Sequence, residues 1–233
     1  MTEGRKLLVS EVFGPTFQGE GPHAGRLCSF VRLGLCNLDC KWCDTPYTWD
    51  WTGKNGPPQD RRMLAHLKPG DLVAQIPTLH SQFVVVSGGE PMVQQTALVE
   101  HLPLWTLPVH VETNGTIYPT DDIAGMVDHW SVSPKLPHAE TTKEAWLPEV
   151  LRCFVGLGAA IKVVVRNTHD VNALARRCDT DRIPADHVWV MPEGRDAEAI
   201  THTIEDVADV TIEHGFNLTG RLHVQAWGDK RGV

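Results

Sequence analysis

Residues 36–45 read Cys36-Asn-Leu-Asp-Cys40-Lys-Trp-Cys43-Asp-Thr45, with three cysteines at the spacing C-x3-C-x2-C. Thiolates so close in sequence can turn toward one metal centre, whereas a disulfide pairs two cysteines and would leave the third alone. Structural zinc normally takes four protein ligands, and no fourth Cys or His lies near this stretch. A four-iron cluster held by three cysteines keeps one iron free for a small molecule. The spacing therefore predicts a [4Fe–4S] cluster in this loop.

The overall composition predicts a single globular domain over residues 1–233. The length is sufficient for one large core, and the contents of 42% hydrophobic and 21% charged residues are ordinary for a soluble protein. A formal net charge of −8 without a basic run argues against nucleic acid as a partner. No membrane-length apolar stretch or signal-type segment occurs, so we expect no membrane partner. Because an iron–sulfur site suits a reducing compartment, we expect a cytoplasmic protein.

Apolar runs predict strands that alternate with helices. The expected strands cover residues 6–13, 28–34, 83–86, 109–113, 129–133, 160–165, 188–191 and 221–226. The expected helical segments cover residues 61–67, 71–76 (capped by Asp71), 93–105, 143–154, 171–178 and 196–214. This order predicts parallel strands with right-handed crossovers, and there are too few helices for a complete eightfold barrel. We therefore expect an α/β fold, namely a partial, open β/α barrel with mostly parallel strands.

A second motif, Ser87-Gly88-Gly89-Glu90-Pro91, directly follows a predicted buried strand. Its two glycines would let backbone groups approach a ligand closely, and Glu90 could accept hydrogen bonds from an ammonium or a hydroxyl. A Gly-Gly turn alone is most often a plain connection. Here this turn, the cysteine loop and the other polar loops, including residues 14–21, follow predicted strands. Since ligands bind at the carboxyl ends of parallel strands, we expect these loops to share one edge of the sheet.

The cysteine loop and the Ser-Gly-Gly-Glu-Pro turn together resemble the radical S-adenosylmethionine superfamily. Further stretches resemble its 7-carboxy-7-deazaguanine synthase family. They are Gly-Pro-Thr-Phe-Gln-Gly-Glu-Gly at 14–21, Phe-Val-Arg at 30–32, Cys-Asp-Thr at 43–45, Glu-Thr-Asn-Gly-Thr at 112–116, Ser-Pro-Lys at 133–135 and Trp-Gly-Asp-Lys-Arg-Gly-Val at 227–233. The resemblance spans nearly the whole chain. It implies the radical S-adenosylmethionine core fold, and it implies one [4Fe–4S] cluster, S-adenosylmethionine and Mg²⁺ as cofactors.

The resemblance also implies a reaction. The family converts 6-carboxy-5,6,7,8-tetrahydropterin to 7-carboxy-7-deazaguanine with loss of ammonia, a carbon–nitrogen lyase step on the route to queuosine and related deazapurines. One electron from the cluster cleaves S-adenosylmethionine, and the resulting radical abstracts hydrogen from substrate C6 before the ring contracts. The hydrogen then returns to regenerate S-adenosylmethionine. The implied partners are an electron donor such as flavodoxin or ferredoxin and a second copy of the chain in a homodimer.

Individual residues acquire roles from the same resemblance. Thr45 would offer its hydroxyl to Mg²⁺, an ion that prefers hard oxygen ligands. The residues implied at the S-adenosylmethionine site are Trp42, Cys43, Asp44, Gly89, Ser133, Lys135, Met191, Pro192 and Glu193. The residues implied at the substrate are Phe17, Gln18, Gly19, Arg32, Ser87 and the terminal carboxylate of Val233, with His223 as a further candidate. No side chain is implied as the catalytic group, because the radical derives from S-adenosylmethionine.

The sequence departs from the family pattern at some positions. It also leaves other hypotheses about its function open. Phe17 replaces a smaller aliphatic residue, and Ala226-Trp227 stands where some members carry a His-Lys pair. An activase that takes hydrogen from a partner protein would not need residues 18–21 or this C-terminal ending. A non-enzymatic iron–sulfur module would leave residues 87–91 without a role. Considered alone, Arg32 could form a surface salt bridge and Thr45 could be an ordinary turn residue.

Overall fold

A computed structural model describes residues 4–228 and 230–233, and within them nine strands form one sheet in the order β3-β1-β2-β4-β5-β6-β7-β8-β9. The strands are β1 (Leu7–Phe17), β2 (Leu27–Leu33), β3 (Ala65–Leu67), β4 (Val84–Gly88), β5 (Val109–Thr113), β6 (His129–Val132), β7 (Ala160–Val165), β8 (Val188–Pro192) and β9 (Asn217–Leu218). β1 pairs antiparallel with β2 and β3, and every other neighbouring pair is parallel. The predicted α/β fold, an open and mostly parallel barrel, is confirmed.

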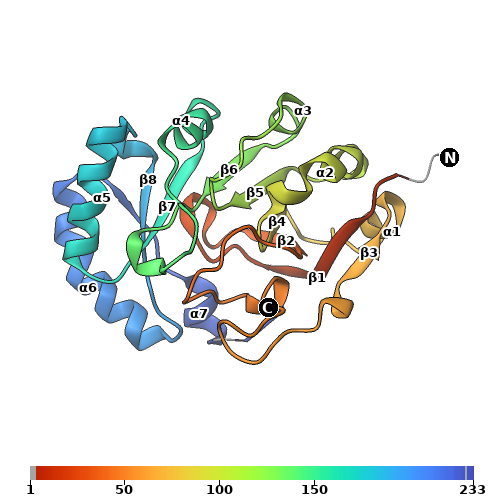
Figure 1. Ribbon diagram of the computed structural model, residues 1–233, viewed down its shortest axis with the longest axis horizontal. Helices are drawn as coiled ribbons and strands as arrows, with labels where there is room; N and C mark the ends of the chain where they lie inside the picture. Colours follow the sequence, from red (N-terminus) through yellow and green to blue (C-terminus); the bar gives the residue numbers. More distant parts are fainter. Residues whose placement is uncertain (1–3, 229) are drawn as a thin grey trace.

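Helices cover the outer side of the curved sheet, while the C-terminus lies near its inner side (Figure 1). The helices are α1 (Pro69–Val73), α2 (Gln95–His101), α3 (Asp121–Ala124), α4 (Pro148–Gly156), α5 (Thr168–Asp181), α6 (Ala197–Glu213) and α7 (Leu222–Trp227). No helix in the described part of the chain is long and apolar enough to cross a membrane.

The period of two along the strands separates an outer face that forms the main core from an inner face that carries both polar residues and a smaller apolar cluster. Val109 and Val111 of β5 belong to the main core, which also contains Leu98 of α2. The intervening residues, His110 and Glu112, therefore face the inside of the barrel. This alternation places ionisable side chains in the interior and still buries a continuous core under the helices. Cys178 on α5 also lies in that core.

The segment 61–76 differs from its prediction. Residues 61–67, predicted as helical, form a single 3-10 turn at Arg61–Met63 followed by β3. β3 pairs with the start of β1, so its backbone groups are satisfied by the sheet. The helix predicted over 71–76 is α1, which has Lys68 at its N-cap position. Asp71 consequently lies in the first turn and is not the cap.

The predicted strand at 221–226 is also wrong, because this stretch forms α7. Its apolar residues at 222, 224 and 226 imitate the alternation of a strand. The shorter β9 already occupies the sheet position next to β8, and Val224 is the buried residue of the helix.

Other element boundaries shift. β1 continues through Gly14-Pro15 to Phe17, with a register shift against β2 after Phe13. The helix predicted over 93–105 is split, since 3-10 turns at Pro91–Gln94 and Leu102–Leu104 flank α2. The helix predicted to start at residue 143 begins at Pro148, and the four-residue α3 was not predicted.

Candidate active site

Most of the predicted site residues gather where the parallel strands end. The cysteine loop follows β2, Ser87 and Gly88 end β4, Ser133 and Lys135 follow β6, and the segment 191–193 ends β8. Carboxyl ends of neighbouring parallel strands lie at the same edge of a sheet, so these segments meet at one mouth of the barrel.

The turn at residues 18–23 is an exception to this expectation. Because β1 is antiparallel, Phe17 pairs with Leu27 at the beginning of β2. His23 then packs between His110 and His129, which lie near the starts of β5 and β6. This turn therefore lies inside the barrel, although its Glu20 is linked through Arg221 to Asp44 of the cysteine loop.

The three cysteines of the loop pack in one small apolar cluster. Cys40 is buried, and Cys36, Cys43 and Trp42 pack against the same cluster. Leu38, Ala139 and Ala145 complete it. The segment that follows β6 thus packs against the cysteine loop, in which Cys40 is buried and Cys36 and Cys43 are partly buried.

The donor set of this loop fits an iron–sulfur cluster. The backbone N–H of Leu38 lies 3.5 Å from Cys36 Sγ, and the indole N–H of Trp49 lies 3.3 Å from Cys43 Sγ. Such N–H···S bonds tune clusters. Among the described residues, no three His, Cys, Asp or Glu side chains meet closely enough for a single metal ion. Thiols that bind separate irons of one cluster stand further apart than ligands of one ion, so this spread does not oppose the assignment.

The pKa of Cys36 bears on how a metal would bind in this loop. Burial raises the pKa of Cys36 to about 12, and the neighbouring Glu90 adds to the effect. A neutral thiol becomes a metal ligand only when the metal displaces its proton. Cluster binding in this loop should therefore release protons.

The Gly-Gly turn after β4 packs directly on the backbone of the cysteine loop. The amide of Gly89 donates to the Leu33 carbonyl at 3.1 Å, and that of Glu90 donates to the Leu35 carbonyl at 2.8 Å. A Cβ on Gly88 would lie 2.1 Å from the Leu33 oxygen, and one on Gly89 would lie 2.0 Å from the Leu35 oxygen. The glycines are therefore needed for contact between the two motifs, in addition to any approach to a ligand.

Glu90 is completely buried and bonded to the protein itself. Its carboxylate accepts hydrogen bonds from the amides of Met92 (2.9 Å) and Asn114 (2.6 Å) and from the Thr113 hydroxyl (2.7 Å). Burial raises its pKa in spite of these bonds. Glu90 thus ties the turn after β4 to the turn after β5, a structural role that the sequence did not reveal.

Several residues expected at S-adenosylmethionine come together beside the cysteine loop. The Lys135 ammonium lies 2.9 Å from Ser133 Oγ and 5.5 Å from the centre of the Trp42 ring. His138, which was not singled out from the sequence, stacks on Trp42 with ring centroids 5.9 Å apart. Its Nε2 lies 3.8 Å from a Glu193 carboxylate oxygen.

This group contains unpaired polar atoms. Trp42 Nε1, both ring nitrogens of His138 and Glu193 Oε2 are buried without a hydrogen-bond partner among the described residues. Leaving such an atom unsatisfied costs about 1–3 kcal/mol. Donors and acceptors concentrated in one place fit a ligand that offers both, as the ribose and adenine of a nucleoside do. The residues present therefore fit the nucleoside part of S-adenosylmethionine.

The interior of the barrel holds a charged network that sequence reasoning missed. The Lys162 ammonium is 2.5 Å from Glu20 Oε2 and 3.5 Å from Glu112 Oε1. Arg221 bridges Glu20 Oε1 at 3.0 Å and Asp44 Oδ2 at 2.7 Å. Burial opposes the charge of Lys162, but Glu112 and Glu20 outweigh it and hold its pKa above the ordinary value. The one sequence feature that pointed to this network was Lys162, a lysine inside the apolar run at 160–165.

The expected substrate residues lie around this network. Gln18 Nε2 donates to Glu112 at 3.2 Å, and the Ser87 hydroxyl donates to the other oxygen of Glu112 at 2.9 Å. Gly19 lies against His223, because a Cβ at Gly19 would be 1.9 Å from His223 Nδ1. The structure therefore brings these four residues to one side of the interior.

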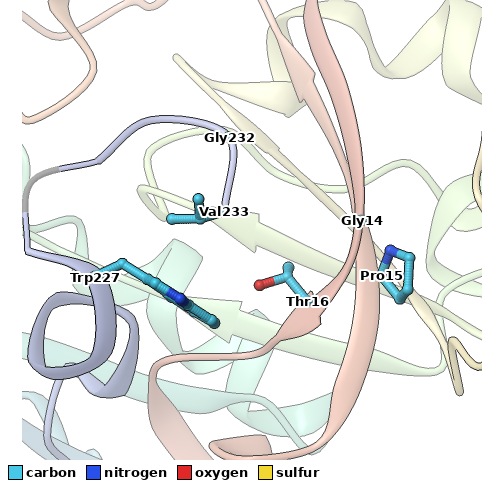
Figure 2. Close-up of a pocket in the computed structure, with 6 residues that line it drawn as sticks. All are labelled: Gly14, Pro15, Thr16, Trp227, Gly232 and Val233. Carbon is cyan, nitrogen blue, oxygen red and sulfur yellow. The ribbon is translucent and has the colours of Figure 1, made fainter.

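Phe17 and Trp227, two of the residues that depart from the family pattern, stack on each other with ring centroids 6.1 Å apart. Trp227 and Val233 help to line a cavity of 280 Å³, whose other lining residues are Gly14, Pro15, Thr16 and Gly232 (Figure 2). The chain end thus lies at a hollow next to the expected substrate residues.

Arg32 lies in different surroundings from those of its alternative, whereas Thr45 lies at a turn, as its alternative described. The Arg32 side chain is 18% exposed, and its Nε donates to Glu11 at 2.7 Å. It forms a salt bridge, but a mostly buried one. Neither Nη atom of Arg32 has a hydrogen-bond partner in the described part of the chain. The Thr45 hydroxyl lies 3.6 Å from Cys43 Sγ, at the entrance of the 3-10 turn Pro46–Thr48.

Comparison with known proteins gives consistent matches over the full chain. No family model matches the chain. It is 34% identical to the 7-carboxy-7-deazaguanine synthase of Pyrobaculum aerophilum over 100% of both chains. It is 35% identical to that of Halobacterium salinarum, over 97% of this chain and 93% of the relative. The fold is similar to the crystal structure of QueE from Escherichia coli, with a TM-score of 0.66, 25% identity and coverage of 94% and 95%.

Proposed function

Because this chain belongs to the 7-carboxy-7-deazaguanine synthase family, a family of lyases, we propose that it converts 6-carboxy-5,6,7,8-tetrahydropterin to 7-carboxy-7-deazaguanine with loss of ammonia. We propose that this radical S-adenosylmethionine reaction depends on Mg²⁺ and serves queuosine or another deazapurine. The observation that carries the proposal is the direct packing of the Gly88-Gly89 turn on the three-cysteine loop, above an interior lined by buried charged groups.

The proposed cofactor site uses residues from four segments. Cys36, Cys40 and Cys43 would hold the [4Fe–4S] cluster. The residues that would line S-adenosylmethionine are Trp42, Cys43, Asp44, Gly89, Ser133, Lys135, Met191, Pro192 and Glu193. When bound, the cluster and S-adenosylmethionine supply the electron and the radical chemistry that start the reaction. The protein's part is to orient the two groups and to exclude water, which the apolar cover of the cysteine loop supports.

The proposed substrate site has a cationic part, formed by Arg32, and a polar part beside Glu112. The free Nη atoms of Arg32 suit the substrate carboxylate, because a guanidinium binds a carboxylate through two parallel bonds. Gln18, Gly19 and Ser87 would contact the pterin ring beside Glu112, while Phe17 and the carboxylate of Val233 would border it. The Glu112 carboxylate can accept hydrogen bonds from ring N–H groups, which gives the flat substrate a defined orientation.

We propose that Thr45 binds Mg²⁺ through its hydroxyl. The support is its place in the loop next to Cys43, where an ion would lie between cluster and substrate. Mg²⁺ takes hard oxygen ligands and usually keeps several waters, so a single protein hydroxyl is a sufficient contact. Such an ion could bind the substrate carboxylate together with Arg32.

Three further proposals concern organisation. The chain would act as one domain, which its continuous sheet supports. It would form a homodimer, and a flavodoxin or ferredoxin would reduce the cluster. Sedimentation equilibrium should give twice the chain mass, and a monomer at working concentration would refute the dimer.

The decisive experiment is anaerobic reconstitution followed by turnover. The protein should bind about four irons per chain and convert the carboxytetrahydropterin with S-adenosylmethionine and Mg²⁺. Cys40→Ala should lose the cluster and the turnover, whereas Cys153→Ala on α4 should keep both. Cleavage of S-adenosylmethionine without conversion of the pterin would show that the substrate is different. Full turnover by Cys40→Ala would refute the cluster assignment.

A further inference from the structure

Glu11 on β1 joins side chains from three other parts of the chain. Its Oε1 accepts hydrogen bonds from Arg32 Nε at 2.7 Å and from the Tyr47 hydroxyl at 2.9 Å, and its Oε2 accepts one from Arg231 Nε at 2.8 Å. The Glu11 side chain is only 15% exposed. A single carboxylate thus connects β2, the segment after the cysteine loop and the end of the chain.

Arg231 is the anchor of that chain end. Its guanidinium carbon lies 3.7 Å from the centre of the Tyr47 ring, so it is held by a cation–π contact as well as by Glu11. Among the described residues, no other hydrogen bond or ion pair involves residues 231–233. Gly232 and Val233 line the cavity beside Thr16, two residues or fewer from this anchor (Figure 2).

The anchor and the proposed substrate-carboxylate residue share one anion. Arg32 uses Nε for Glu11, and neither of its Nη atoms has a hydrogen-bond partner among the described residues, so both can bind a ligand. Burial by itself would raise the pKa of Glu11, but the hydrogen bond from Arg231 and the charge of Arg32 outweigh it and hold the pKa below its ordinary value. Glu11 is consequently an anion at neutral pH.

We propose that Glu11 is a positioning residue: it orients Arg32 toward the substrate carboxylate and, through Arg231, holds the chain end at Val233 against the cavity beside Thr16. This inference rests on the proposed function for the identity of the substrate. The Glu11 carboxylate would thus support substrate binding in two ways. It would take no part in the radical chemistry. Loss of Glu11 should therefore weaken substrate binding and free the chain end together.

Two measurements on matched variants test this coupling. Glu11→Gln should raise KM for the carboxytetrahydropterin about tenfold or more while kcat changes less than about threefold, because charge-assisted hydrogen bonds are lost from binding. Carboxypeptidase should release Val233 about tenfold faster from Glu11→Gln and Arg231→Gln than from the unaltered chain, as followed by mass spectrometry. The double variant should release it no faster than either single variant, since both break the same anchor.

The control is Glu100→Gln, which removes a surface bond to Arg5 of the same 2.7 Å length at the other end of β1. It should leave KM and Val233 release within about twofold of the unaltered chain. If Glu11→Gln does not fold or load iron, Tyr47→Phe and Arg231→Lys report on the same contacts.

The outcomes separate the two proposals. An unaltered chain that never converts the pterin refutes the proposed function, and the release of Val233 still tests the anchor. Conversion by the unaltered chain, with KM and release both unmoved in the Glu11 and Arg231 variants, overturns the positioning role. Faster release with an unmoved KM also overturns it, because the chain end would then be anchored without consequence for substrate.

Discussion

The ammonium of Lys162 lies 2.5 Å from Glu20 Oε2, in the middle of the barrel, with only 5% of the lysine side chain exposed. Removing Lys162 leaves Glu20 with Arg221 alone and leaves Glu112 without an ion-pair partner among the described residues. We expect Lys162→Met to lower the free energy of unfolding by about 3–5 kcal/mol in urea denaturation. Lys41→Met breaks an exposed pair with Glu140 and should cost less than about 1 kcal/mol. Equal losses in the two variants would contradict the buried, charged state of Lys162.

Acid should destabilise the protein through its interior histidines. Burial and the neighbouring imidazole of His23 lower the pKa of His110 to about 3 and that of His129 to about 4. The unfolded chain takes up protons below the ordinary value of 6.5, but the folded chain does not, so stability is lost as the pH falls from 6.5 toward these lower values. The window from pH 6.5 to about pH 5 precedes most carboxylate titration.

The variant His110→Phe tests this pH dependence. It keeps a ring stacked on Phe83, whose centroid lies 4.0 Å from that of His110. Over the same pH window the variant should lose about 1–2 kcal/mol less unfolding free energy than the unaltered chain. Identical pH profiles would mean that His110 is protonated as easily in the folded state as in the unfolded state.

A methyl group at Gly89 should disturb the cysteine loop, because its Cβ would lie 2.0 Å from the Leu35 oxygen. We expect Gly89→Ala to cost about 1–3 kcal/mol of unfolding free energy and to reduce the iron bound on reconstitution. Gly156→Ala at the end of α4 meets no atom within 4 Å and should be neutral or slightly stabilising. Full iron loading by Gly89→Ala would show that the loop can move away without loss.

The proposed magnesium contact predicts a selective defect. Thr45→Ala should weaken the stimulation of turnover by Mg²⁺ and leave the absorption spectrum of the cluster intact. Thr45→Ser keeps the hydroxyl and should restore the stimulation. Loss of the spectrum in Thr45→Ala would instead make Thr45 a structural residue of the loop.

The ring nitrogens of His138 form no hydrogen bond among the described residues, although Asp170 and Glu193 lie 3.5 Å and 3.8 Å away. We therefore expect His138 to contribute to cofactor affinity. His138→Phe keeps a ring against Trp42, and it should weaken S-adenosylmethionine binding about tenfold in calorimetry of the reconstituted protein. His214→Phe, which removes a ring bonded to Asn172 at the end of α6, is the matched control and should bind normally. Unchanged affinity in His138→Phe would place the nucleoside elsewhere.

The sequence predicts the features that depend on short stretches. Buried strands such as 83–86 and 160–165 stand out as apolar runs, and Cys36, Cys40 and Cys43 need only their own spacing. The direction of β1 could not be predicted in this way, because it depends on pairing with β2 across a turn. The helix α7 could not be predicted either, since Leu222, Val224 and Ala226 alternate like strand residues.

Ionic contacts between residues far apart in the chain could not be predicted from local sequence patterns either. Glu11 and Arg231 are 220 residues apart in the chain, and Glu20 and Arg221 are 201 apart. Neither arginine lies in a pattern that points to its partner. Lys162 did interrupt an apolar run, but its two carboxylates come from other loops and strands. Such pairs become visible only when the sheet brings their strands together.

The antiparallel first strand has a consequence for the entry of substrate and the release of product. The turn after β1 and the three packed histidines lie toward the amino ends of the parallel strands, so we expect the opening used by ligands to be the carboxyl-end mouth beside the cysteine loop. Substrate would have to enter, and product would have to leave, through the same opening. A product molecule would then occupy the site in place of the next substrate, and inhibition by product should be competitive with the proposed pterin substrate.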